Sequence, residues 1–134
     1  MKDRVLIDTS VWIPYLQGAA SGELERIVDE LLAGREVLVP KIVLAELIQG
    51  ARSEKDIAVI LEFLEAFTVI DEGEKTWLDA GRLSYDMKKK GKTINLADCY
   101  IAILAREHKA SILTLDKHFK DLHKDTGLEL IDIE

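Results

Sequence analysis

Short apolar runs alternate along the chain with longer segments whose apolar residues recur at the spacing of an α-helix. We expect strands in five of these runs, at residues 5–7, 36–39, 68–70, 111–114 and 129–131. The first, second and fourth runs have little polar alternation, as in strands covered by helices on both faces. This order of elements predicts an α/β layered fold with a mostly parallel sheet.

Apolar stripes and capping residues predict two amphipathic helices between these strands. One stripe covers residues 24–32, with Ser21 as its N-cap. Ser53 and Asp56 resemble a capping box that opens a second stripe over residues 57–64. We expect both helices to cover the sheet.

Length and composition predict one globular domain over residues 1–134, since 48% of the residues are hydrophobic. The apolar run before Asp8 is too short for a signal-peptide core, and no segment approaches a membrane span. We therefore expect a soluble, cytoplasmic protein. The single cysteine, Cys99, excludes an internal disulfide and a cysteine zinc cage, and we expect it to pack as a small hydrophobe.

The net charge of −7, from 18 basic and 25 acidic residues, argues against binding nucleic acid by bulk positive potential. Any polyanion must be bound locally. The one concentrated basic run consists of Lys88, Lys89, Lys90 and Lys92. Such lysines also suit a solvated helix end, where they complement the helix dipole.

Two acids follow predicted strands. Asp8 comes directly after the first strand, and Asp116 comes after the fourth. Either could belong to a turn, and Asp116 could be a helix N-cap. In open parallel sheets, however, the ligand crevice lies beyond the carboxyl ends of the strands, where both acids are placed.

Two further acids interrupt apolar helical segments. Glu46 lies within residues 42–48, which we expect to form a largely buried helix, and Asp98 lies within residues 96–105. A buried, unpaired carboxylate is costly, so each acid needs a partner or a cation. Asp98 could join a capping arrangement with Asn95, and Glu46 could form a buried ion pair with an arginine or lysine.

Convergence of these four acids would require a cation. One carboxylate pair at about 4 Å repels by about 4 kcal/mol at an effective dielectric near 20. Oxygen ligands with room for water are what Mg²⁺ or Mn²⁺ prefers. Such an ion can polarise a phosphoryl oxygen and activate a bound water, so the acids favour metal-assisted phosphodiester hydrolysis.

Other polar residues are left outside this site. The acids within residues 71–74 form a polar cluster before a helix and predict a turn with first-turn charges. His108, His118 and His123 lack the spacing of a helical metal pair, so we expect surface positions. Only His118 lies close to Asp116 in sequence.

Four segments together resemble the motifs of the PIN-domain nucleases, and within them the VapC-type ribonuclease toxins of toxin–antitoxin pairs. In order along the chain they are IDTSVWI at 7–13, ELIQG at 46–50, DCYIA at 98–102 and TLDKHF at 114–119. Each motif is short, but their shared order and spacing extend over nearly the whole chain.

The resemblance implies a three-layer α/β/α fold and an endoribonuclease that depends on Mg²⁺ or Mn²⁺. It also implies four catalytic, metal-binding acids, which are Asp8, Glu46, Asp98 and Asp116. We expect the three aspartates to hold the principal ion. Glu46 would bind through water or orient the attacking hydroxide, while Ser10 and Thr114 would support the site as hydrogen-bond donors.

The resemblance further implies a homodimer and a small antitoxin partner that blocks the active site, with RNA as the substrate. Lys88, Lys89, Lys90 and Lys92 are our candidates for contacts with the RNA backbone. The chain departs from the family at His118, where many relatives carry another acid. This departure leaves one or two metal ions as alternatives.

Other classes fit the sequence less well. An aspartate-dependent phosphatase needs a second acid two residues after the nucleophile, but Ser10 stands there. A phosphoacceptor receiver needs neighbouring acids at the first strand end, which Asp8 and Thr9 do not supply. A noncatalytic subunit or a housekeeping RNA-processing protein of the same family stays as the alternative.

Overall fold

A computed structural model, described here for residues 3–133, contains a four-stranded parallel sheet in the order β3-β2-β1-β4. Its strands are β1 (Arg4–Ile7), β2 (Glu36–Pro40), β3 (Thr68–Ile70) and β4 (Ser111–Leu113). These are the first four strands predicted from the sequence. The apolar residues of β1, β2 and β4 are largely buried, as expected for strands with helices on both faces, whereas only Ile70 of β3 is buried.

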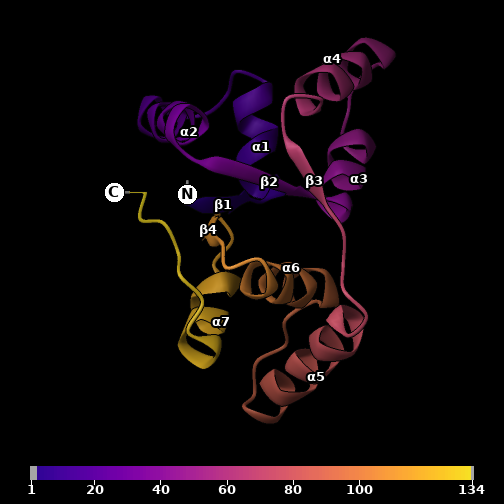
Figure 1. The fold of residues 1–134 in the computed structure, drawn as a ribbon, viewed down its shortest axis with the longest axis vertical. Helices are drawn as coiled ribbons and strands as arrows, with labels where there is room; N and C mark the ends of the chain where they lie inside the picture. The colour runs from indigo at the N-terminus through magenta and orange to yellow at the C-terminus, as the bar shows by residue number, and fades with distance from the viewer. Residues whose placement is uncertain (1–2, 134) are drawn as a thin grey trace.

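Helices cover both faces of the sheet within the described residues (Figure 1). They are α1 (Thr9–Leu16), α2 (Gly22–Gly34), α3 (Lys41–Gln49), α4 (Glu54–Leu64), α5 (Thr76–Lys89), α6 (Leu96–Glu107) and α7 (His118–Thr126). The first four lie on one side of the sheet, and the last three lie on the other. The three-layer α/β/α architecture is thereby confirmed.

The predicted helix starts have the expected side-chain caps. Ser21 accepts a hydrogen bond from the Leu24 N–H at 3.1 Å, and Ser53 accepts one from the Asp56 N–H at 3.2 Å. The Asp56 carboxylate accepts from the N–H of Arg52 rather than of Ser53, so the reciprocal bond of a capping box is shifted by one residue.

Two expectations need correction. Residues 129–131 do not form a strand, because their pairing with β4 is limited to one parallel bridge between Leu130 and Ile112. The helix that carries Glu46, α3, is only partly buried: Val43 and Leu47 are its buried residues. This helix packs against β2, α1 and α4, which leaves the rest of its apolar surface partly exposed.

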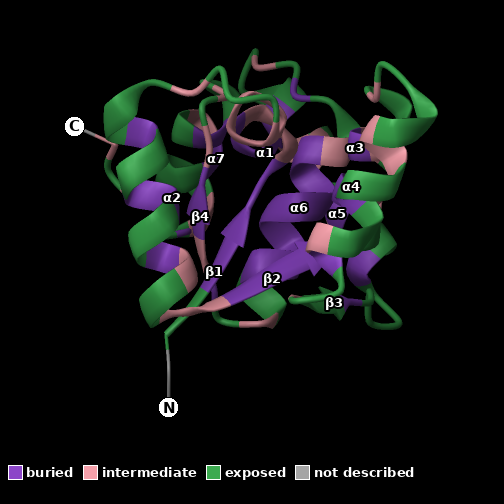
Figure 2. Cartoon of the chain, turned by 90° about the horizontal axis from the view of Figure 1, so that it is seen from above, coloured by how far each residue is buried: buried purple, intermediate pink, exposed green. Residues whose placement is uncertain are grey.

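The hydrophobic core lies on both faces of the sheet, around the buried strand β1 (Figure 2). Helix α6 is buried along most of its length, including Cys99, which packs in the core as predicted. Within residues 3–133 no helix is both long enough and apolar enough to cross a membrane.

The strand order reverses direction at β1. From β1 the chain proceeds to β2 and then β3 on one side, while β4 returns to the other side of β1. Such a reversal separates the connections that leave two neighbouring strands and opens a crevice at their carboxyl ends. Asp8 and Asp116 follow these two strands, so the topology places both acids at this crevice.

Candidate metal centre

The register between β1 and β4 sets the position of Asp8. Ile7 pairs with Leu113, and the Asp8 N–H donates to the Leu113 carbonyl at 3.2 Å. Asp8 and Thr114, the residues that follow this pair, therefore leave the sheet side by side. Asp8 is 4% exposed, because the buried end of β1 holds its backbone inside the protein.

Two hydroxyl groups orient the Asp8 carboxylate. Ser10 donates to Asp8 Oδ1 at 2.6 Å, and Thr114 donates to Asp8 Oδ2 at 2.8 Å. Each hydroxyl oxygen also accepts a backbone N–H from the loop after β4, Leu115 for Ser10 and Asp116 for Thr114, both at 2.9 Å. The predicted supporting pair thus ties the ends of β1 and β4 together.

Asp98 enters the site from the first turn of α6. Its N–H donates to Asn95 Oδ1 at 2.8 Å, which confirms the predicted cap. The Asn95 side-chain amide in turn donates to Asp98 Oδ2 at 3.0 Å. The capping interpretation is therefore correct for Asp98, and the cap also fixes the direction in which its carboxylate enters the cluster.

Asp116 and His118 approach Asp98 from the start of α7. The Asp116 carboxylate accepts the His118 N–H at 3.0 Å, as a residue at a helix start does. His118 Nδ1 lies 3.4 Å from Asp98 Oδ2 and 3.3 Å from Asp116 Oδ1. One ligand atom from each of these three residues lies within 4.8 Å of the other two.

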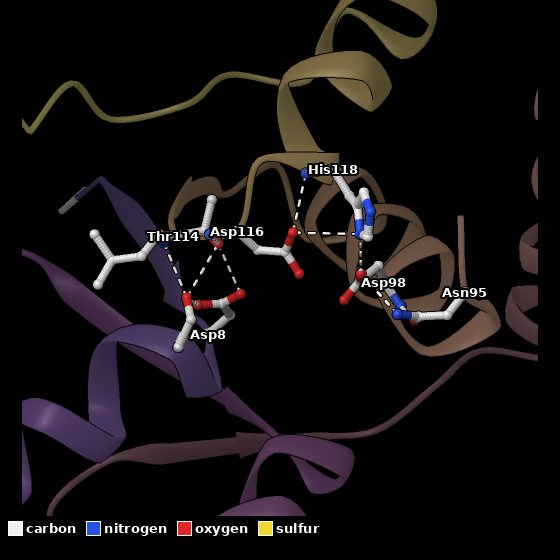
Figure 3. Close-up of polar contacts among 8 residues, drawn as sticks. Asp8, Asn95, Asp98, Thr114, Asp116 and His118 are labelled. Carbon is white, nitrogen blue, oxygen red and sulfur yellow. Dashed lines mark hydrogen bonds and ion pairs between the residues drawn. The ribbon is translucent and has the colours of Figure 1, made fainter. Parts of the chain in front are cut away.

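Figure 3 shows the Asp116 carboxylate between Asp8 on one side and Asp98 with His118 on the other. Burial raises the pKa of Asp8, and the charge of Asp116 raises it further, against the effect of its two hydroxyl donors. Burial together with repulsion from Asp116 and Asp8 raises the pKa of Asp98 to about 6. The cluster therefore holds more negative charge than its own hydrogen bonds stabilise.

Glu46 lies next to this cluster but outside it. The Thr9 hydroxyl, one residue from Asp8, donates to Glu46 Oε1 at 2.9 Å. Glu46 is half-buried and forms no ion pair with any residue in 3–133, so the expected buried ion pair is wrong. Glu46 thus faces the start of α1, one residue from Asp8.

The basic run lies at the end of α5 and in the turn before α6. Lys88 and Lys89 occupy the last turn of α5, as predicted for a helix end. Two further lysines pair with α7: Lys90 with Asp125 at 2.8 Å and Lys92 with Asp121 at 3.3 Å. Lys90 and Lys92, two of the four lysines proposed to contact RNA, therefore also connect the end of α5 to α7.

Sequence reasoning missed His118 and the amide of Asn95 as members of this cluster. The signal for His118 was its position two residues after Asp116, at the start of a helix. The signal for Asn95 was its spacing of three residues from Asp98, which allows its side chain to contact both the N–H and the carboxylate.

The acids at 71–74 lie outside the cluster, as expected. Asp71 pairs with Lys41, and Glu72 accepts a hydrogen bond from Tyr100.

The donor set fits a divalent cation. Two largely buried carboxylates with raised pKa values lie close to a third in the same crevice. None of the three forms an ion pair with a lysine or arginine of the described residues. A bound cation would relieve the repulsion between these carboxylates and favour the ionised forms of Asp8 and Asp98. The hydroxyl donors and Asn95 hold the carboxylates in place, as partners of metal ligands do.

Residues 5–125 match the model of the PIN domain family, so the chain belongs to that family. Among its relatives is Ribonuclease VapC1 of Methanocaldococcus jannaschii, which is 30% identical over 98% of this chain and 89% of the relative. Ribonuclease VapC2 of Haemophilus influenzae is 32% identical over 77% of this chain and 79% of its own length.

Solved structures show the same fold. The structure of VapBC-1 from nontypeable Haemophilus influenzae aligns with a TM-score of 0.77 and 27% identity, covering 97% of this chain and 98% of that chain. VapBC2 from Rickettsia felis aligns with a TM-score of 0.78 and 22% identity over 96% of this chain and 97% of that chain. The α/β/α architecture is therefore that of the family.

Proposed function

We propose that this protein is a metal-dependent endoribonuclease of the VapC type and acts as the toxin of a toxin–antitoxin pair. The observation that carries the proposal is the meeting of Asp8, Asp98 and Asp116 at the reversal of strand order. Similarity to proteins named ribonuclease over nearly the whole chain supports the substrate class.

Asp8, Asp98 and Asp116 would hold Mg²⁺ or Mn²⁺ through their carboxylate oxygens. When bound, the ion supplies Lewis-acid stabilisation of the phosphoryl charge and an acidified water. The chain's own contribution is geometric. Ser10 and Thr114 fix both oxygens of Asp8, and α6 and α7 bring the other two carboxylates against it.

Glu46 is proposed to orient the attacking water. Its Oε1 accepts from the Thr9 hydroxyl, which leaves Oε2 free of any hydrogen bond to residues 3–133. A carboxylate placed beside the cluster but outside its ligand distances can accept a proton from a nearby water, which is the role of a general base.

A small antitoxin protein and a second copy of this chain are the proposed partners. The resemblance to VapC-type toxins supports both, and the likeness to VapBC-1 supports the first. The acidic net charge of −7 is compatible with a basic inhibitory segment that binds near the acidic crevice.

Expression of the parent and of Asp8→Asn side by side tests the proposal. The parent should arrest growth and cut RNA in cells, and the purified protein should cut RNA only with Mg²⁺ or Mn²⁺. Asp8→Asn should do neither, while Asp3→Asn, a matched change at an exposed residue, should behave as the parent. Cleavage in excess chelator would contradict the metal mechanism, and cleavage without growth arrest would favour a housekeeping nuclease.

A further inference from the structure

The side chain of His118 lies in the acidic cluster although it is not buried. Its side chain is 49% exposed, yet its ring nitrogen faces both carboxylates, at 3.4 Å from Asp98 and 3.3 Å from Asp116. Figure 3 shows the ring directed toward these two residues. An exposed histidine at a helix start could instead turn toward solvent, but the contact of Nδ1 with Asp98 directs this ring into the acidic cluster.

The backbone fixes this position independently of the ring. The His118 N–H donates to the same Asp116 oxygen that faces the ring, so the two residues form one local unit. The next residue, Phe119, is fully buried and anchors the first turn of α7 in the core. The ring is therefore held within reach of the site by the fold.

We propose that His118 is a direct nitrogen ligand of the metal centre and makes the centre selective for Mn²⁺ over Mg²⁺. The separations of 3.4 and 3.3 Å between His118 Nδ1 and the two carboxylate oxygens fit neighbouring ligands of one ion at the usual distances of about 2.0–2.2 Å. This inference rests on the proposed function, which requires a metal but does not specify a nitrogen ligand.

The selectivity follows from the donor atoms. Mg²⁺ is a hard ion that prefers oxygen, whereas imidazole nitrogen suits transition metals, so replacing an acid with histidine weakens the site for Mg²⁺ more than for Mn²⁺. A neutral imidazole also adds no negative charge to a cluster that already contains three neighbouring carboxylates. The chain thus retains a ligand at this position while reducing the repulsion between its acids.

Pulsed electron paramagnetic resonance of the Mn²⁺-loaded protein tests the proposal directly. The parent should show the modulation of a directly coordinated imidazole nitrogen, and His118→Gln should lose it. His123→Gln, a matched change on the same helix, should keep it. His118→Asp supplies a carboxylate instead, so it should bind Mn²⁺ without the nitrogen signal. Circular dichroism melts establish that each variant is folded.

Competition between Mg²⁺ and Mn²⁺ tests the proposed selectivity. With Mg²⁺ added against bound Mn²⁺, the preference for Mn²⁺ should fall about tenfold or more in His118→Asp. Bound Mn²⁺ without nitrogen coupling in the parent would overturn the ligand assignment and leave the metal-dependent nuclease intact. Absence of Mn²⁺ binding in the parent would overturn both proposals. An unchanged preference in His118→Asp would overturn the selectivity.

Discussion

The hydroxyl of Thr114 donates a hydrogen bond to Asp8 at 2.8 Å, although the two residues are 106 positions apart in the chain. The parallel pairing of β1 with β4 makes this contact possible, because each residue directly follows a paired strand end. Thr114 also accepts the Asp116 N–H, so one side chain links two of the clustered acids.

Thr114→Val should weaken metal binding and RNA cleavage by about 10- to 100-fold, because it removes a partner that orients Asp8, a carboxylate we propose to bind the metal. The change preserves volume closely, and the loss of stability should be about 1 kcal/mol. Calorimetric titration with Mn²⁺ and a cleavage assay would measure both effects.

Thr126→Val is the matched control for this prediction. Thr126 also donates one hydrogen bond and accepts another, with Leu122 and Leu128, but it lies at the end of α7 away from the acids. It should lose comparable stability and retain metal affinity. Equal losses of affinity in both variants would show that the effect comes from destabilisation rather than from Asp8.

The metal-free protein should become less stable as pH rises from about 4 to about 6. The pKa of Asp98 is about 6 in the folded protein against 3.8 ordinarily, so the folded state binds more protons in this window. The free energy of unfolding then falls with rising pH by about 1–3 kcal/mol and stays lower above the window. Denaturant titrations in chelator would measure this loss.

Asp98→Asn should make this pH dependence shallower and stabilise the metal-free protein at neutral pH. An amide carries no charge to desolvate, and its oxygen can still accept from Asn95. Asp8 also has a raised pKa, so part of the slope should persist. An unchanged slope in Asp98→Asn would show that Asp98 does not titrate abnormally.

The sequence was sufficient to predict the sheet and the acids at its edge because both depend on local patterns. Buried parallel strands are continuous apolar runs, and an acid directly after such a run can be recognised in the sequence. The reversal of strand order then places Asp8 and Asp116 at one crevice. The cap at Asn95 was also readable, because capping depends on residues only three positions apart.

The errors involve contacts that depend on tertiary packing. The apolar run at 129–131 has strand character, but only Leu130 meets β4 in register. Glu46 lies in an apolar helix, yet how much of that helix is buried depends on its neighbours in the layer. The contact of His118 with Asp98 depends on where α7 begins relative to α6, which the spacing of histidines along the chain does not reveal.

Glu46→Gln should separate metal binding from RNA cleavage. If Glu46 orients water, the variant should lose RNA cleavage by about 10²- to 10⁴-fold, since an amide cannot accept the proton. It should keep the stabilisation by Mn²⁺, which is about 2.7 kcal/mol at one hundred times the dissociation constant for a protein that binds the ion only when folded. Thermal melts with and without Mn²⁺, beside single-turnover cleavage, would measure the two effects.

The controls for Glu46→Gln are Asp8→Asn, which should lose both cleavage and stabilisation by Mn²⁺, and Glu62→Gln on the exposed side of α4, which should lose neither. Loss of the Mn²⁺ effect in Glu46→Gln would contradict the proposed role and would place Glu46 among the direct metal ligands.

The lysines at the end of α5 should divide into two pairs. Lys88 and Lys89 have no ion pair with another residue of the described chain, so replacing both with alanine should lower the salt dependence of RNA binding. Each lost phosphate contact with single-stranded RNA should reduce the slope of log affinity against log salt by about 0.7. Filter binding in the Asp8→Asn background, which we expect to be inactive, over a range of salt concentrations would measure the slope.

The other pair, Lys90 and Lys92, contacts Asp125 and Asp121 of α7. Replacing these two with alanine should cost up to about 1 kcal/mol of stability, because partly exposed ion pairs contribute little. Their effect on the salt slope should be smaller than that of Lys88 and Lys89, since their charges are already partnered within the protein. An identical slope for the parent and both double variants would mean that RNA reaches the acids by another path, without touching the end of α5.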